Sequence, residues 1–159
     1  MEKIFHIEEN ISEETVQKFK SFLKIIEHNE TIRLHLNSWG GNSGAGKRIE
    51  GYIYYMKKYK SCIFITEAKI AASAAFRIFI RGNKRIITEE SIVQIHLPVP
   101  NIPNISPKLI AIERKKDIYF ITNTIPCLTA EEVIKYDDLP LSIDFMLKKN
   151  IATEVVQSF

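Results

Sequence analysis

Three short segments carry residue types that could together perform acyl transfer. Residues 37–41 (Asn-Ser-Trp-Gly-Gly) follow a predicted strand, residues 71–75 (Ala-Ala-Ser-Ala-Ala) open an apolar stretch, and residues 95–98 (Ile-His-Leu-Pro) close another strand. Acyl transfer needs a nucleophile, a base that takes its proton, and N–H donors that stabilise the developing oxyanion. A serine, a histidine and a glycine pair are residues of these three kinds.

Ser73 is the candidate nucleophile and His96 the candidate base. The alanines around Ser73 leave room for a side chain that projects from a tight strand-to-helix turn, as glycines do in the GxSxG elbow. The amide of Ala74, at a helix start, would point at the same oxyanion as the amide of Gly41. His96 lies between an apolar strand and a proline-rich loop (97–107), where it could reach a cleft. The simpler alternative places Ser73 in a small-residue helix packed against a neighbour.

The glycine-rich turn also admits a second chemistry. Residues 41–48 (Gly-Asn-Ser-Gly-Ala-Gly-Lys-Arg) nearly match the phosphate-binding pattern GxxxxGK[ST]. Arg48, however, stands where a hydroxyl would ligate magnesium. The apolar strand 92–95 is followed by His96 rather than by a carboxylate. Nucleotide binding therefore remains the less favoured alternative.

Strand and helix patterns alternate along the chain. Strands are predicted at 3–7, 32–36, 62–66, 85–87 and 92–96. Helices are predicted after the cap residue Ser12, after the glycine-rich turn, over 71–80, from 106–107 to about 121, and from the capping box at 129–132. Residues 143–147 form an apolar element whose type the pattern does not decide. This order predicts an α/β fold with a largely parallel sheet, in a single domain over 1–159.

Composition excludes several classes of protein. Of the 159 residues, 45% are hydrophobic and 26% charged, and the net charge of +3 is too small to predict nucleic-acid binding. The longest nearly apolar stretch, 70–80, is too short to span a bilayer and contains Arg77. The N-terminus lacks the pattern of a signal peptide, which favours a cytoplasmic protein. The histidines show no spacing typical of metal ligands, so neither a metal nor a cofactor is expected.

Taken in order, the motifs Asn-Ser-x-Gly-Gly, Ala-Ala-Ser-x-Ala, Ile-His-x-Pro and Leu-Thr-Ala-Glu-Glu resemble the Clp protease proteolytic subunit (ClpP) family, over roughly 32–136. The resemblance implies a ClpP/crotonase spiral of ββα units. It implies Ser73 as nucleophile and His96 as general base, with the amides of Gly41 and Ala74 as oxyanion hole. It also implies a peptide or unfolded-protein substrate, and a homo-oligomeric ring whose active sites face an internal chamber.

The chain departs from this family at the third member of the triad. The family places an acidic residue three positions before the leucine equivalent to Leu128, and here that residue is Ile125. The candidates to replace it are Asn123, Thr124 and Asp117. In serine proteases, loss of the orienting carboxylate lowers turnover by about 10⁴. The sequence therefore predicts a slow or specialised serine peptidase that uses a Ser–His dyad.

Other departures concern assembly. Trp39 replaces the proline of Asn-Ser-Pro-Gly-Gly, and the segment between His96 and Leu128 is shorter than the family's handle region, which counts against stacking of rings. No N-terminal docking loop precedes Ile4, which counts against an ATPase chaperone partner. The alternatives to a peptidase are an inactive ClpP-like assembly subunit, a crotonase-like acyl-coenzyme A enzyme and the nucleotide binder described above.

Overall fold

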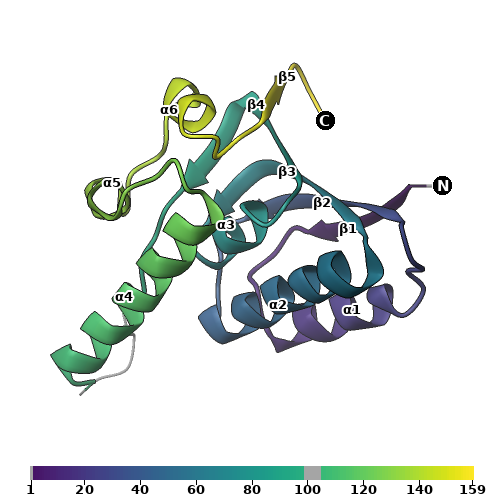
Figure 1. The fold of residues 1–159 in the computed structure, drawn as a ribbon, viewed down its shortest axis with the longest axis horizontal. Coiled ribbons are helices and arrows are strands. Elements are labelled where there is room, and N and C mark those ends of the chain that lie inside the picture. The colour runs from purple at the N-terminus through teal and green to yellow at the C-terminus, as the bar shows by residue number, and fades with distance from the viewer. Residues whose placement is uncertain (1, 99–104) are drawn as a thin grey trace.

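The protein is built on one sheet of five parallel strands, in the order β1-β2-β3-β4-β5 (Figure 1). The structure, a computed structural model, describes residues 2–98 and 105–159. The strands are β1 (Lys3–Ile7), β2 (Thr31–Ser38), β3 (Ile63–Ala72), β4 (Lys84–Gln94) and β5 (Glu154–Val156). Because neighbouring strands are parallel, their carboxyl ends lie along one edge of the sheet. The predicted α/β class and parallel sheet are confirmed.

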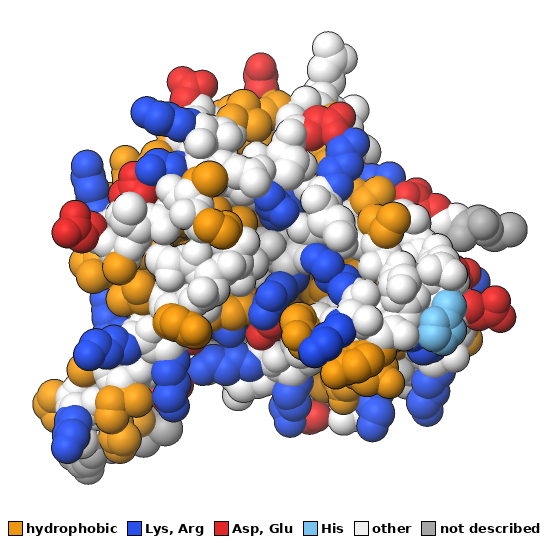
Figure 2. Space-filling view, viewed as in Figure 1, with side chains coloured by type: hydrophobic (Ala, Val, Ile, Leu, Met, Phe, Trp, Pro, Cys, Tyr) orange, Lys and Arg blue, Asp and Glu red, His pale blue; other side chains and the backbone are white. Residues whose placement is uncertain are grey.

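Helices connect the strands, and the first three along the chain pack against the sheet. They are α1 (Glu13–Leu23), α2 (Ser43–Lys60), α3 (Ala74–Phe79), α4 (Pro107–Thr124), α5 (Ala130–Lys135) and α6 (Ile143–Lys148). The first two lie side by side beneath the strands, and α4 projects from the body of the molecule (Figure 1). Hydrophobic side chains gather at the projecting end of α4 (Figure 2). Within the described residues, no helix combines the length and apolar character needed to cross a bilayer.

The alternation of side chains along β2 explains how the sheet acquires its two faces. Ile32, Leu34 and Leu36 are fully buried on the side of the sheet that the helices cover. Arg33 and His35 point to the opposite face and remain partly exposed. Successive residues of a strand point to opposite faces, so this period of two places one side of β2 in the core. The core lies between the sheet and the helices, and α4, α5 and α6 add buried residues to those of α1, α2 and α3.

The predicted elements differ from the observed ones in three places. The predicted helix 71–80 is wrong at its start, because pairing with β2 and β4 extends β3 through Ala72. The two strands predicted at 85–87 and 92–96 form one strand, β4, which ends at Gln94. The short strand β5 was not predicted, because its three half-buried residues are too few for a period to be recognised. The element at 143–147 is helix α6. Most of the predicted loop 97–107 lies outside the described residues.

Candidate active site

Ser73 occupies a sharp turn between a strand and a helix. The strand β3 ends at Ala72, α3 begins at Ala74, and Ser73 between them has φ 52° and ψ −120°. A residue with a side chain rarely adopts this positive φ, and the strain costs of order 1–3 kcal/mol. The Ser73 side chain is half-buried and forms no hydrogen bond that caps α3. The turn is therefore shaped like the nucleophile elbow expected from the sequence.

The Gly40–Gly41 turn packs directly against Ser73. Both glycines have positive φ, 106° and 142°. A Cβ atom added to Gly40 would lie 2.7 Å from Ser73 Cβ and 3.1 Å from the Ala74 nitrogen. Only glycine fits where the backbone of residue 40 comes this close to Ser73 and Ala74. The glycine turn, the serine and the start of α3 are therefore in direct contact.

Hydrogen bonds hold the glycine turn in place from the side of α1. Ile11 N–H donates to the Gly40 carbonyl at 2.7 Å, and Asn42 N–H donates to the Ile11 carbonyl at 2.8 Å. Gly40 N–H donates to Ser38 Oγ at 3.1 Å. Among the described residues, these bonds leave the Gly41 N–H without a protein acceptor. This N–H is thus available to a ligand.

The strand register brings the three predicted segments to the same edge of the sheet. Ser38 pairs with Ala71, and Ala72 pairs with Gln94. Continuing this register beyond the strand ends places Gly40 beside Ser73 and Ser73 beside the residue that precedes His96. The ends of β2, β3 and β4 that carry the three segments thus lie along one edge of the sheet.

His96 is less firmly placed than Ser73. Its side chain is 38% exposed, and its Nε2 lies 3.6 Å from Asp138 Oδ1. In the described part of the chain, no hydrogen bond joins the Ser73 hydroxyl to the His96 ring. Asp138, whose carboxylate faces this imidazole, is not among the candidates named from the sequence.

The proposed substitutes near the end of α4 have other partners. Asn123 Nδ2 donates to the Tyr119 carbonyl at 2.7 Å, and Thr124 Oγ1 donates to the Phe120 carbonyl at 2.8 Å. Ile125 follows α4 and is buried, with 2% of its surface exposed. These side chains complete the end of a helix, and none of their described polar contacts involves His96.

Asp117 belongs to a buried charge cluster rather than to the serine turn. Its Oδ1 lies 3.0 Å from Arg77 Nη1 and 3.6 Å from Lys47 Nζ. The Arg77 guanidinium also stacks on the Phe120 ring, 3.7 Å from its centroid. Burial lowers the pKa of Arg77, and the carboxylates of Asp117 and Glu50 offset this effect in part. The cluster joins α4 to α2 and α3. Lys47, the lysine of the phosphate-loop alternative, therefore has an acidic partner in Asp117.

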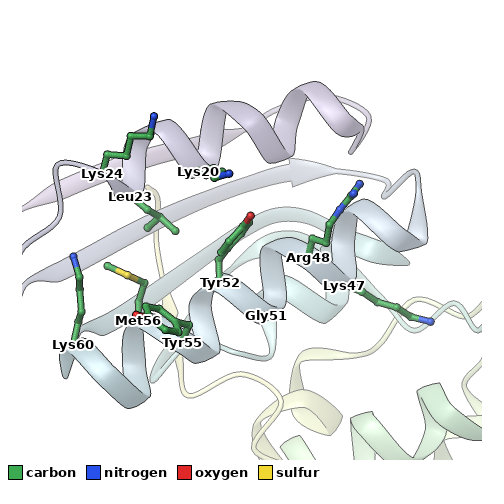
Figure 3. Close-up of a pocket in the computed structure, with 10 residues that line it drawn as sticks. All are labelled: Lys20, Leu23, Lys24, Lys47, Arg48, Gly51, Tyr52, Tyr55, Met56 and Lys60. Atoms are coloured by element: carbon green, nitrogen blue, oxygen red, sulfur yellow. The ribbon is translucent and has the colours of Figure 1, made fainter.

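A wide groove lies away from Ser73 and His96. It has a volume of about 700 Å³ and runs between α1 and α2, where Leu23, Tyr52 and Met56 contribute apolar surface (Figure 3). None of its lining residues belongs to the serine turn or to the end of β4. Over the residues that the structure describes, no group of three or more His, Cys, Asp or Glu side chains is placed to hold a metal ion.

Comparison with known proteins points to the same family as the motifs in the sequence. The Clp protease family model matches residues 1–135. ClpP1 from Listeria monocytogenes has 22% identity and a TM-score of 0.78, and a point mutant of that protein has 23% identity and a TM-score of 0.81. Both alignments cover 98% of this chain and 92% of the other.

The catalytic domain of the ClpP protease from Plasmodium falciparum has 22% identity and a TM-score of 0.79, over 98% of this chain and 86% of that one. Among curated protein sequences, none matches this chain significantly. At these identities the solved structures establish the ClpP fold alone. The family model covers most of the chain, and we conclude that this chain belongs to the Clp protease family.

Proposed function

We propose that this protein is a serine peptidase that cleaves peptide bonds through an acyl-enzyme at Ser73. The observation that carries the proposal is the backbone of Ser73, held at φ 52° between β3 and α3 with the glycine turn against it. A strained serine persists only where its surroundings over-determine it, and such strain is concentrated at functional sites. Membership of the Clp protease family favours this activity over acyl-coenzyme A chemistry or nucleotide binding.

The reaction would proceed in two steps. Ser73 Oγ attacks the peptide carbonyl carbon while His96 takes the hydroxyl proton, and the N–H groups of Gly41 and Ala74 stabilise the oxyanion. His96 then gives this proton to the leaving amine as the C–N bond breaks. Water, activated by the same imidazole, hydrolyses the ester and releases the new carboxylate. Each N–H donor contributes a factor of about 10²–10³ in rate.

The substrate would be an extended peptide docked beside the glycine turn. Trp39 is 60% exposed at the end of β2. The backbone between Trp39 and Gly44 lies at the same edge of the sheet as Ser73. A peptide that pairs with this backbone as an added strand would bring its carbonyl to the serine.

Covalent labelling tests the proposal. The purified protein is incubated with a fluorophosphonate, and the adduct is located by mass spectrometry. We expect labelling at Ser73, loss of the label in Ser73→Ala, and a large decrease in His96→Gln. Ser21→Ala, which changes an exposed serine of α1, is the control and keeps the label. A folded, concentrated protein without label at Ser73 contradicts the peptidase.

A second candidate is an inactive assembly subunit. It is favoured by the buried Ile125 at the position of the family's acid and by the lack of a hydrogen bond between Ser73 and His96 among the described residues. This candidate predicts a normal oligomer without labelling or peptide turnover. The fluorophosphonate experiment therefore separates the two.

Both candidates include a ring of identical subunits. Leu109, Ile112 and Tyr119 on the projecting helix α4 are 55%, 40% and 72% exposed. Apolar side chains on a projecting helix favour burial against another copy of the chain. Sedimentation should detect an oligomer that Ile112→Glu dissociates. Ile25→Glu, which changes an exposed isoleucine away from α4, is the control and leaves the oligomer intact.

A further inference from the structure

The segment that follows α5 is fastened alongside the end of β4. Asp138 N–H donates to the Ile95 carbonyl at 2.9 Å, and Leu141 N–H donates to the Val93 carbonyl at 2.9 Å. An antiparallel bridge joins Pro140 to this strand end between those two bonds. Backbone bonds to Val93 and Ile95, just before His96, thus fix where the carboxylates of this segment lie.

Of the carboxylates of Asp137 and Asp138, the first is engaged by groups other than the imidazole. Asp137 accepts a hydrogen bond from Leu97 N–H at 2.8 Å and pairs with Arg114 Nη2 at 2.6 Å. Asp138 has φ 65°, a conformation that aspartate and asparagine tolerate better than most residues. Within residues 2–98 and 105–159, the one basic group within 4 Å of its carboxylate is the His96 ring, with Nε2 at 3.6 Å.

We infer that Asp138 is the residue that positions His96, in place of the acid that Ile125 replaces. The inference rests on the proposed function. A carboxylate facing Nε2 favours the tautomer that carries its proton there, which leaves Nδ1 as the acceptor for the Ser73 proton. In the usual triad the carboxylate faces Nδ1, so the two ring nitrogens exchange roles here.

The distance between Asp138 and His96, and the exposure of both side chains, limit how much Asp138 can contribute to positioning the ring. At 3.6 Å the two atoms are beyond hydrogen-bond range, and hydrogen bonds of catalytic groups commonly shorten once substrate is bound. The Asp138 side chain is 64% exposed, so water screens the pair. Asp138 should therefore contribute far less than a buried triad acid. Asp137 and Arg114 form a charged pair that meets the backbone one residue after His96, at Leu97.

Nitrogen NMR of the histidine rings tests the inference without requiring activity. The tautomer ratio of neutral His96 is measured from its ¹⁵N chemical shifts in the wild type, in Asp138→Asn and in Asp138→Gly. Both variants tolerate the positive φ of this residue. We expect the proportion protonated at Nε2, relative to Nδ1, to fall about threefold in the glycine variant. Asp144→Asn, an exposed change in the first turn of α6, is the control and leaves the ratio unaltered.

Labelling at Ser73 is then measured on the same samples. If Asp138 positions the base, the labelling rate falls about tenfold in Asp138→Gly, with unchanged circular dichroism and thermal unfolding. An unchanged tautomer ratio overturns the inference, whether or not the rate changes. If the ratio shifts while the wild type takes no label, the pairing of Asp138 with His96 stands and the peptidase proposal fails. The two failures are thus distinguishable.

Discussion

The carboxyl ends of β2 and β3 and the carboxyl end of β4 meet at one edge of the sheet, yet they are built differently. At the first two, glycine, serine and helix backbones approach so closely that added atoms would overlap. At the third, His96 is exposed, and its charged neighbour Asp138 is more exposed still. The nucleophile is held by packed backbone, whereas the base depends on the positions of two side chains. Substitutions should therefore disturb the first region through folding and the second through rate alone.

The largest effect is expected from Gly41→Ala. A Cβ at this position would lie 2.4 Å from the Ile11 carbonyl oxygen, at φ +142°. We expect the free energy of unfolding to fall by about 4 kcal/mol and labelling of Ser73 to be lost. Denaturant unfolding and fluorophosphonate labelling measure the two effects.

A glycine in open space provides the matched control for this change. Gly51, in α2, has nothing within 4 Å of an added Cβ. Gly51→Ala should stabilise the protein by up to about 1 kcal/mol, because alanine favours the helix more than glycine. A Gly41→Ala protein as stable as the wild type would show that the glycine turn is less constrained than its contacts indicate.

Ile125→Asp tests whether the family's acid position still faces the base. Ile125 is buried and closes the end of α4, so a carboxyl group there loses apolar contacts and enters a poorly solvated environment. We expect the free energy of unfolding to fall by about 3 kcal/mol, with no gain in the rate of Ser73 labelling. Ile134→Asp, at an exposed isoleucine of α5, should change stability little. Faster labelling in Ile125→Asp would place this position beside His96 and count against Asp138.

A smaller loss is expected when the buried charge cluster is broken. Arg77→Leu leaves the Asp117 carboxylate buried, although Lys47 still lies 3.6 Å away and Glu50 keeps its pair with Arg81. Because of these remaining partners, we expect a loss of about 2 kcal/mol, below the usual cost of breaking a buried ion pair. Chemical unfolding measures it. If Asp117 only fastens α4, Asp117→Asn destabilises the protein without altering the His96 tautomer ratio, and a changed ratio would return Asp117 to the site.

The smallest effect is expected from His35, a histidine whose ring contacts both neighbouring strands and whose pKa is lowered. Its Nδ1 lies 2.9 Å from Glu67 on β3, and its ring stacks on His6 of β1. Burial lowers the pKa of His35 below its ordinary value of 6.5, and the Glu67 carboxylate offsets this only in part. The unfolded chain therefore binds the proton more readily than the folded one. The stability that neutral His35 contributes is full above about pH 6.5 and is lost as the pH falls through its lowered pKa.

Urea unfolding across this range checks the sign. The difference in stability between wild type and His35→Asn should shrink as the pH falls from 7.5 towards 5. A difference that grows on acidification would mean that the charged pair with Glu67 outweighs burial.

The sequence alone was sufficient for the parts of this protein that depend on local pattern. Alternation placed Ile32, Leu34 and Leu36 in the core strand, and capping residues such as Ser12 and Thr129 marked helix starts that the structure confirms. The motif order identified the family, because glycines and small residues at a close approach of backbones are visible without coordinates. The residues of each motif and the order of the motifs along the chain are properties of the sequence itself, so they can be recognised without coordinates.

Only the tertiary structure decided which carboxylate lies beside the imidazole. Asp117 was a reasonable candidate by distance along the chain, but Arg77 on α3 binds it. Asp138 lies 42 positions after His96, a separation with no periodic signal, and it reaches the ring only because residues 138–141 hydrogen-bond to the end of β4. The end of β3 was likewise set by pairing with strands on both sides rather than by its alanines. Contacts between distant segments depend on packing of the whole fold, and no spacing in the sequence encodes them.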